Sequence, residues 1–124
     1  MSSIGHVRAM ALALSEVTES DHHGMASFRV RGKIFATVPD DEHVRIMLDE
    51  NGIRSAVAEE PLICDEFYWG KKLACVVVAV KPATTSLLQE LLIDAWLLKA
   101  PVSLTRRVGE TRSAETSALD ERGR

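Results

Sequence analysis

The sequence predicts an α+β fold in which an antiparallel sheet of about five strands carries helices on one face. Three observations predict it. Segment 27–38 alternates apolar and polar residues around Gly32, as a β-hairpin does. The run Leu73–Val80 is almost continuously apolar, which is typical of a central strand. Segments 3–14 and 84–98 instead repeat apolar residues at helical spacing, so the chain mixes both kinds of element.

The first half of the chain is interpreted as one helix and three strands. The helix over 3–14 begins after serines that can cap it. The polar segment 16–24 breaks the apolar pattern and is assigned to a connection. The hairpin 27–38 follows, with Gly32 in its turn, and segment 43–48 is the third strand.

The second half is interpreted as helix, two strands and helix. Asp49 can cap a short helix that runs to about Ala58, and a strand over 62–69 follows it. A turn at residues 70–72 leads into the apolar strand that ends at Val80. The predicted order is therefore α-β-β-β-α-β-β-α, a two-layer sandwich.

Length and composition indicate one domain. The chain has 124 residues, of which 46% are hydrophobic and 27% charged, with a net charge of −3. Residues 1–108 are assigned to the domain, and residues 109–124, which lack an apolar period, to a disordered C-terminal tail. The N-terminus has no signal-peptide pattern and no run reaches membrane-spanning length, so a cytoplasmic protein without membrane contact is expected.

The residues that could carry chemistry form no recognisable constellation. Cys64 lies beside Asp65 and Glu66, whose negative charges would raise the pKa of its thiol and so make it a poor nucleophile. His22 and His23 are adjacent, and neighbours in a loop rarely both face one metal. The sequence therefore predicts no enzyme activity, no metal and no cofactor.

Basic and aromatic residues near the two predicted hairpin turns are the candidate site. Basic side chains there could contact phosphates, and aromatic ones could stack on unpaired bases. The alternative is that the charges only solvate hairpin tips and the aromatics belong to the core. The candidate phosphate-binding residues are Arg29, Arg31, Lys33, Lys71 and Lys72, and the candidate stacking residues are Tyr68 and Trp69.

Several segments together resemble the MmcQ/YjbR family of small bacterial proteins over residues 5–104. The segments are Val17-Thr18-Glu19, Ser27–Val30, Gly32–Ala36, Trp69 and Ala95–Pro101. The resemblance implies a two-layer fold, similar to secretion chaperones and to double-wing DNA-binding domains. Family members are commonly labelled DNA-binding, a label that rests on analogy of fold. His22-His23 and the acidic Asp65-Glu66 depart from the usual pattern.

The expected function is therefore non-catalytic DNA binding through the basic hairpin residues. The alternative is a protein–protein interaction or homodimerisation module, since the broad apolar stripe from Leu87 to Leu98 could leave one edge exposed. A monomer or weak homodimer is expected. The sequence indicates neither the nucleic acid nor the pathway.

Overall fold

The computed structural model describes residues 2–105. Within them lie three helices and six strands. In chain order they are α1 (Ile4–Leu12), β1 (Val17–His22), β2 (Met25–Val30), β3 (Lys33–Val38), β4 (His43–Ile46), α2 (Glu50–Glu59), β5 (Cys64–Trp69), β6 (Lys72–Ala79) and α3 (Thr85–Lys99). The predicted tail, residues 109–124, lies outside the described part of the chain.

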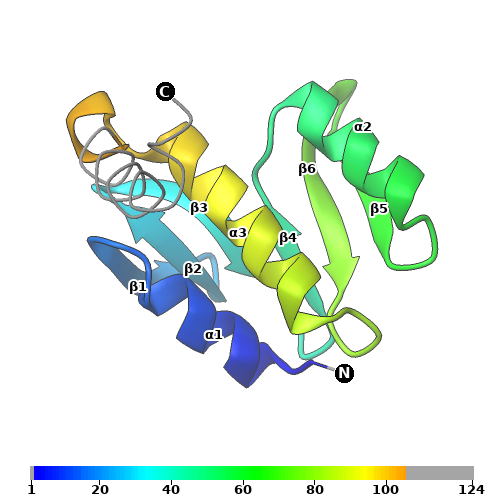
Figure 1. Ribbon diagram of the computed structural model, residues 1–124, viewed down its shortest axis with the longest axis horizontal. Coiled ribbons are helices and arrows are strands. Elements are labelled where there is room, and N and C mark those ends of the chain that lie inside the picture. Colours follow the sequence, from blue (N-terminus) through cyan, green and yellow to red (C-terminus); the bar gives the residue numbers. More distant parts are fainter. Residues whose placement is uncertain (1, 106–124) are drawn as a thin grey trace, which may run out of the picture.

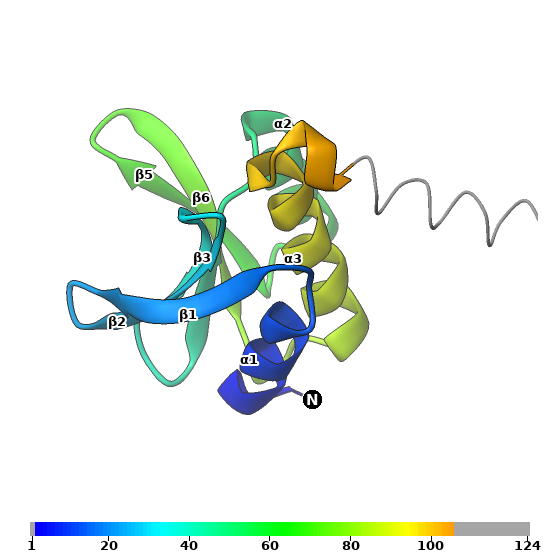
Figure 2. The same ribbon diagram turned by 90° about the vertical axis from the view of Figure 1, so that its left-hand side faces the viewer.

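The six strands form one sheet in the order β1-β2-β3-β4-β6-β5, and all neighbouring strands are antiparallel. The three helices lie on one side of this sheet (Figures 1 and 2). On the other side no helix of the described residues covers it, and the β1–β2 and β5–β6 hairpins reach outward there (Figure 2). The predicted α+β class and the helices on one face are confirmed.

The sixth strand, β1, corrects the assignment of segment 16–24 to a connection. Its sequence is polar, and only Val17 and His22 at its two ends are half-buried. It forms because it pairs with β2 along its full length, from Val17 opposite Val30 to His22 opposite Met25. An edge strand with one wet face needs few apolar residues. The sheet therefore has six strands where five were predicted.

The predicted hairpin at Gly32 is confirmed as β2 and β3. Arg31 and Gly32 have φ of 51° and 84°, the positive values at both central positions that a tight two-residue hairpin turn requires. Between Phe28 and Arg29 the register with β3 shifts by one residue. This bulge adds local twist to the sheet.

Side-chain caps fix the start of each helix. Ser3 and His6 form a capping box at α1. At α2 the Asp49 Oδ1 accepts a 2.7 Å hydrogen bond from the Gly52 amide, as the sequence predicted. At α3 the Thr84 hydroxyl accepts one of 3.0 Å from the Leu87 amide. Each cap satisfies an amide that the helix itself leaves free.

The core lies between the helices and the sheet. Its largest fully buried side chains include Phe28 and Phe35 of the hairpin, Ile46 of β4, and Leu88 and Trp96 of α3. On the strands, these residues are the ones whose side chains point toward the helices, and on α3 they lie on the side that faces the sheet. None of the described helices has the length and apolarity needed to cross a membrane.

Candidate nucleic-acid interface

The face of the sheet that carries no helix is defined by strand alternation. Phe28, Ala36, Ile46 and Val76 lie opposite one another across β2, β3, β4 and β6, and all four are buried in the core. The residues that alternate with them face the other side. We call this surface the bare face; its members used below are Thr18, Ser20, Ser27, Arg29, Thr37, Arg45, Asp65, Phe67, Trp69, Cys75 and Val77.

Two arginines lie half-buried on the bare face, Arg29 of β2 and Arg45 of β4. Neither forms an ion pair with any carboxylate of residues 2–105. The three other described arginines all form one: Arg8 with Glu19, Arg31 with Glu16, and Arg54 with Glu50 and Glu66. The bare face therefore carries positive charge that the described residues do not neutralise.

Arg45 is held over an aromatic ring. Its guanidinium carbon lies 4.4 Å from the centroid of Phe67 on β5, in cation–π contact. Phe67 in turn contacts Trp69, with ring centroids 6.4 Å apart and planes at 60°. Trp69 is 72% exposed, although an indole is among the costliest side chains to leave in water. The cation and the exposed ring thus belong to one connected surface.

A row of hydroxyls crosses the bare face beside Arg45. Ser27 lies opposite Ser20 and Thr37, and Thr37 lies opposite Arg45. The Ser27 hydroxyl donates to the Ser20 carbonyl at 2.9 Å and accepts from Arg29 Nε at 3.2 Å. Thr37 is 3% exposed, and its hydroxyl has no hydrogen-bond partner within the described structure.

The predicted basic turns lie at the same end of the sheet. β3 and β6 both pair antiparallel with β4, so they run in the same direction. The Arg31-Gly32 turn precedes β3 and the Gly70-Lys71 turn precedes β6, which places both turns at one end. Lys33, Lys71 and Lys72 are exposed there. Arg31 is also exposed, but it forms a two-pronged pair with Glu16, in which Nη2 and Oε2 are 3.0 Å apart.

The two predicted stacking residues face opposite sides of the sheet. Tyr68 donates a 2.7 Å hydrogen bond from its hydroxyl to Glu66 Oε1, and Glu66 approaches Arg54 of α2 at 3.8 Å. Tyr68 therefore lies on the helix side, whereas Trp69 contacts Phe67 on the bare face. The bond to Glu66 raises the pKa of Tyr68. Tyr68 is 45% exposed.

The thiols and histidines lie apart from one another. Cys64 and Cys75 are free and buried, and burial raises the pKa of each thiol to about 11. For Cys75 the positive charge of Arg45 acts in the opposite direction. His22 and His23 meet edge to face at the β1–β2 turn, with ring centroids 4.4 Å apart. Among the described residues, no three His, Cys, Asp or Glu side chains gather as metal ligands.

Sequence reasoning missed Arg45 and Thr37 as members of the site. Arg45 stands between Val44 and Ile46, an alternation that already places it on the face opposite the core. That signal was present in the sequence. Two other features follow from tertiary structure and could not be predicted from local sequence. They are that Arg45 has no carboxylate partner among the described residues and that the Thr37 hydroxyl has no hydrogen-bond partner there.

The fold and this surface define a class: a small α+β domain with helices on one side of its sheet and a bare face, with unpaired arginines, on the other. The family model described as YjbR matches residues 12–98, and the chain belongs to the YjbR family. Among solved structures, it is similar to Deinococcus radiodurans protein DR2400, which carries the domain DUF419, with a TM-score of 0.70 and 18% identity. That match covers 88% of this chain and 89% of the other, and it shows the shared fold. No curated protein matches.

Proposed function

We propose that this protein binds single-stranded DNA on its bare face and does so without catalysing a reaction. Phosphates contact Arg29 and Arg45, and Lys71 and Lys72 at the β5–β6 turn, where Lys72 lies opposite Trp69, extend the positive surface toward the strand end. An unpaired base stacks on Trp69. The observation that carries the proposal is the coincidence, on one surface, of two arginines without carboxylate partners and an exposed indole ring.

Arginines without partners support a phosphate ligand for an energetic reason. An arginine in a partly buried position whose guanidinium loses hydration normally regains the lost interactions from a carboxylate or another anion. The Arg45 guanidinium has Phe67 beneath it and a neighbouring unsatisfied hydroxyl on Thr37. A phosphate oxygen bound there would accept hydrogen bonds from the Arg45 guanidinium.

The exposed indole supports an unpaired base as the second part of the ligand. Stacking on an aromatic side chain stabilises single-strand complexes by about 1–3 kcal/mol per base. Trp69 and Lys71 are separated only by Gly70, so the stacking surface and a phosphate contact lie side by side. Asp65 is the acidic residue of this surface; it lies two strands from Arg45, across Val77, and forms no ion pair with it.

Binding without catalysis is supported by the state of the candidate nucleophiles. Both thiols are buried and have a pKa of about 11, so thiolate is scarce at neutral pH. Ser27, which lies within the bare face, donates its hydroxyl proton to a backbone carbonyl and not to a base. A serine nucleophile needs a base that takes that proton.

A salt-dependent titration tests the proposal. Fluorescence anisotropy of labelled single-stranded and duplex oligonucleotides is measured over a salt series. We expect tighter binding of the single strand and a linear fall of log affinity with log salt, with a slope of about −0.7 for each phosphate contacted. Loss of the indole in Trp69→Ala should weaken single-strand binding about 5- to 150-fold.

A matched control uses Trp69→Phe, which keeps an aromatic face and should retain most of the affinity. Absence of saturable binding at low salt would refute the proposal. Equal affinity of the parent protein and Trp69→Ala would refute the stacking role and leave only phosphate contact.

A further inference from the structure

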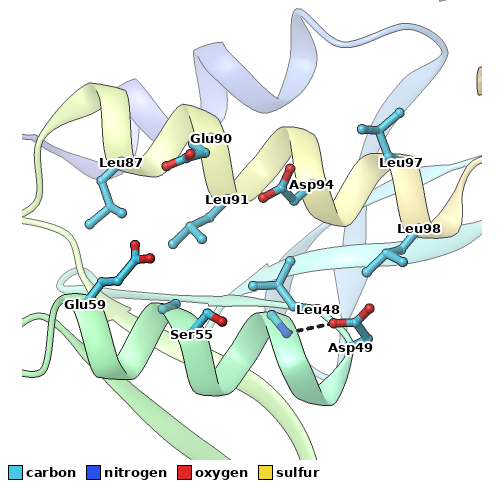
Figure 3. A pocket seen from close by; sticks show the side chains of 12 residues that line it. Leu48, Asp49, Ser55, Glu59, Leu87, Glu90, Leu91, Asp94, Leu97 and Leu98 are labelled. Carbon is cyan, nitrogen blue, oxygen red and sulfur yellow. Dashed lines mark hydrogen bonds between the residues drawn. The ribbon is translucent and has the colours of Figure 1, made fainter. Parts of the chain in front are cut away.

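A groove between α2 and α3 lies on the side of the molecule opposite the bare face (Figure 3). It has a volume of about 430 Å³. Its floor is apolar, and Leu48, Leu87, Leu91 and Leu98 lie along it (Figure 3). Leu98 is 50% exposed, and its neighbour Leu97 is 37% exposed. The stripe on α3 that the sequence predicted as a possible interaction edge therefore ends in accessible leucines.

The rims of the groove are acidic. Asp49 and Glu59 belong to the α2 side, and Glu90 and Asp94 to the α3 side. The lining includes no lysine, arginine or histidine. Glu59, Glu90 and Asp94 form no ion pair within residues 2–105, because Arg54, the described arginine of α2, is engaged with Glu50 and Glu66 instead. The negative field along the groove is therefore not neutralised by the described residues.

We propose that this groove binds a basic amphipathic helix of a partner protein. The floor suits a helix because leucines of α3 recur along it from Leu87 to Leu98, a length of about 16 Å, or about three turns of a docked helix. Apolar residues of the partner at i, i+4 and i+7 meet these leucines. Lysines or arginines on the flanks of the same helix meet the carboxylates on both rims.

Charge complementarity argues for a partner rather than a second copy of this chain. Apart from histidine, each described helix carries a single basic residue, which is Arg8 in α1, Arg54 in α2 and Lys99 in α3. None of them offers two cationic flanks. The segment 106–124 holds five arginines and four acidic residues, a net charge of +1, so it is also a poor complement to the groove.

A designed peptide tests the proposal with the full chain. The probe is a labelled synthetic helix with leucine at every third or fourth position and lysine on both flanks; its twin carries glutamate in place of lysine. We expect saturable binding of the basic helix, weaker at high salt, and no binding of the twin. The double variant Glu90→Gln/Asp94→Asn should weaken binding about 2- to 30-fold, as the loss of two exposed charge pairs predicts.

The control variant is Asp41→Asn/Asp65→Asn, which removes the same charge from exposed positions outside the groove and should leave the affinity unchanged. Trp69→Ala should also leave peptide binding unchanged, which separates this site from the bare face. Equal binding of the two peptides, or equal effects of the two double variants, would overturn the proposal. Light scattering that shows a dimer of the parent protein and a monomer of Glu90→Gln/Asp94→Asn would overturn it in favour of self-association.

Discussion

Trp96 of α3 donates a 3.0 Å hydrogen bond from its indole Nε1 to the carbonyl oxygen of Ser15, in the connection between α1 and β1. The two residues are 81 positions apart in the chain. Trp96 is 2% exposed and belongs to the largest fully packed side chains of the core. The bond therefore ties the last helix to the first connection and satisfies a carbonyl that the polar chain between α1 and β1 leaves without a helical partner.

Replacement of Trp96 by phenylalanine should destabilise the protein. The variant loses the hydrogen bond to Ser15 and leaves space where the larger ring was, at a combined cost of about 2–3 kcal/mol. Urea unfolding followed by circular dichroism measures this loss. Trp69→Phe is the matched control, because Trp69 is 72% exposed and its replacement should change stability by less than about 0.5 kcal/mol. Similar losses in the two variants would contradict this account.

Elements with a strong local pattern were predictable from the sequence. The hairpin around Gly32 was predicted because apolar residues alternate on both sides of a turn residue, and the structure confirms it as β2 and β3. The cap at Asp49 was equally local, since a side chain and an amide three residues away suffice. In both cases the interactions that fix the structure lie within a few residues of each other.

Strand β1 was not predictable in this way. Its inward-facing residues include Glu19, which lies opposite the buried Phe28 and forms an ion pair of 3.0 Å with Arg8 of α1. A glutamate in an inward position removes the alternation that indicates a strand. The strand is specified by its partner β2 and by a helix that precedes it in the chain, which are tertiary features.

The candidate site was predicted only in outline. The sequence located basic and aromatic residues at two hairpins, and the topology places both turns at one end of the sheet. The pairing of Arg31 with Glu16 depends on tertiary structure, whereas the opposite directions of Tyr68 and Trp69 were available from alternation in the predicted strand and were not used. The register shift between Phe67 and Tyr68 adds a residue to β6 and not to β5, so Tyr68 and Trp69, as neighbours in one strand, point to opposite sides by ordinary alternation.

Replacement of Thr37 by valine should stabilise the protein or leave its stability unchanged. Thr37 is 3% exposed and its hydroxyl is unsatisfied, so removal of the hydroxyl relieves a desolvation cost of about 1–3 kcal/mol, reduced by any repacking around the added methyl. Thermal or urea unfolding measures the change. Thr18→Val on the same face is the control, since Thr18 is exposed and should respond within about 0.5 kcal/mol. A marked loss of stability in Thr37→Val would show that its hydroxyl has a partner in solution.

Replacement of Gly32 by alanine should destabilise the β2–β3 hairpin by about 1–2 kcal/mol, because Gly32 has a φ of 84° that a side chain disfavours. A Cβ at this position would meet no atom within 4 Å, so the cost is backbone strain and not a clash. Gly5→Ala provides a control of opposite sign: it lies in α1, and alanine there should stabilise the helix by up to about 1 kcal/mol. A loss of stability in both variants would mean that packing, and not the positive φ of Gly32, explains the effect.

The buried thiols should make stability fall in alkaline solution. Burial raises the pKa of Cys64 and Cys75 to about 11, whereas thiols in the unfolded chain have a pKa of about 8.5. Above that pH the folded state binds more thiol protons than the unfolded state. The free energy of unfolding therefore keeps the contribution of the protonated thiols at neutral pH and loses it as the pH rises toward about 11. Urea unfolding across this range measures it. In Cys64→Ala/Cys75→Ala the free energy of unfolding should be lower at neutral pH and should fall less steeply as the pH rises. An unchanged dependence on pH would show that these thiols do not cause the alkaline loss of stability.

Removal of the charge of Arg45 should weaken single-stranded DNA binding and reduce its salt dependence. In Arg45→Gln the slope of log affinity against log salt should become shallower by about 0.7, the value expected for one phosphate contact to a single strand. The matched control is Arg54→Gln, which removes the same charge from a helix-side arginine that already pairs with Glu50 and Glu66. Its slope should stay at the parent value. Because both variants change the net charge equally, equal slopes in the two would mean that Arg45 acts only through the overall charge of the protein and touches no phosphate.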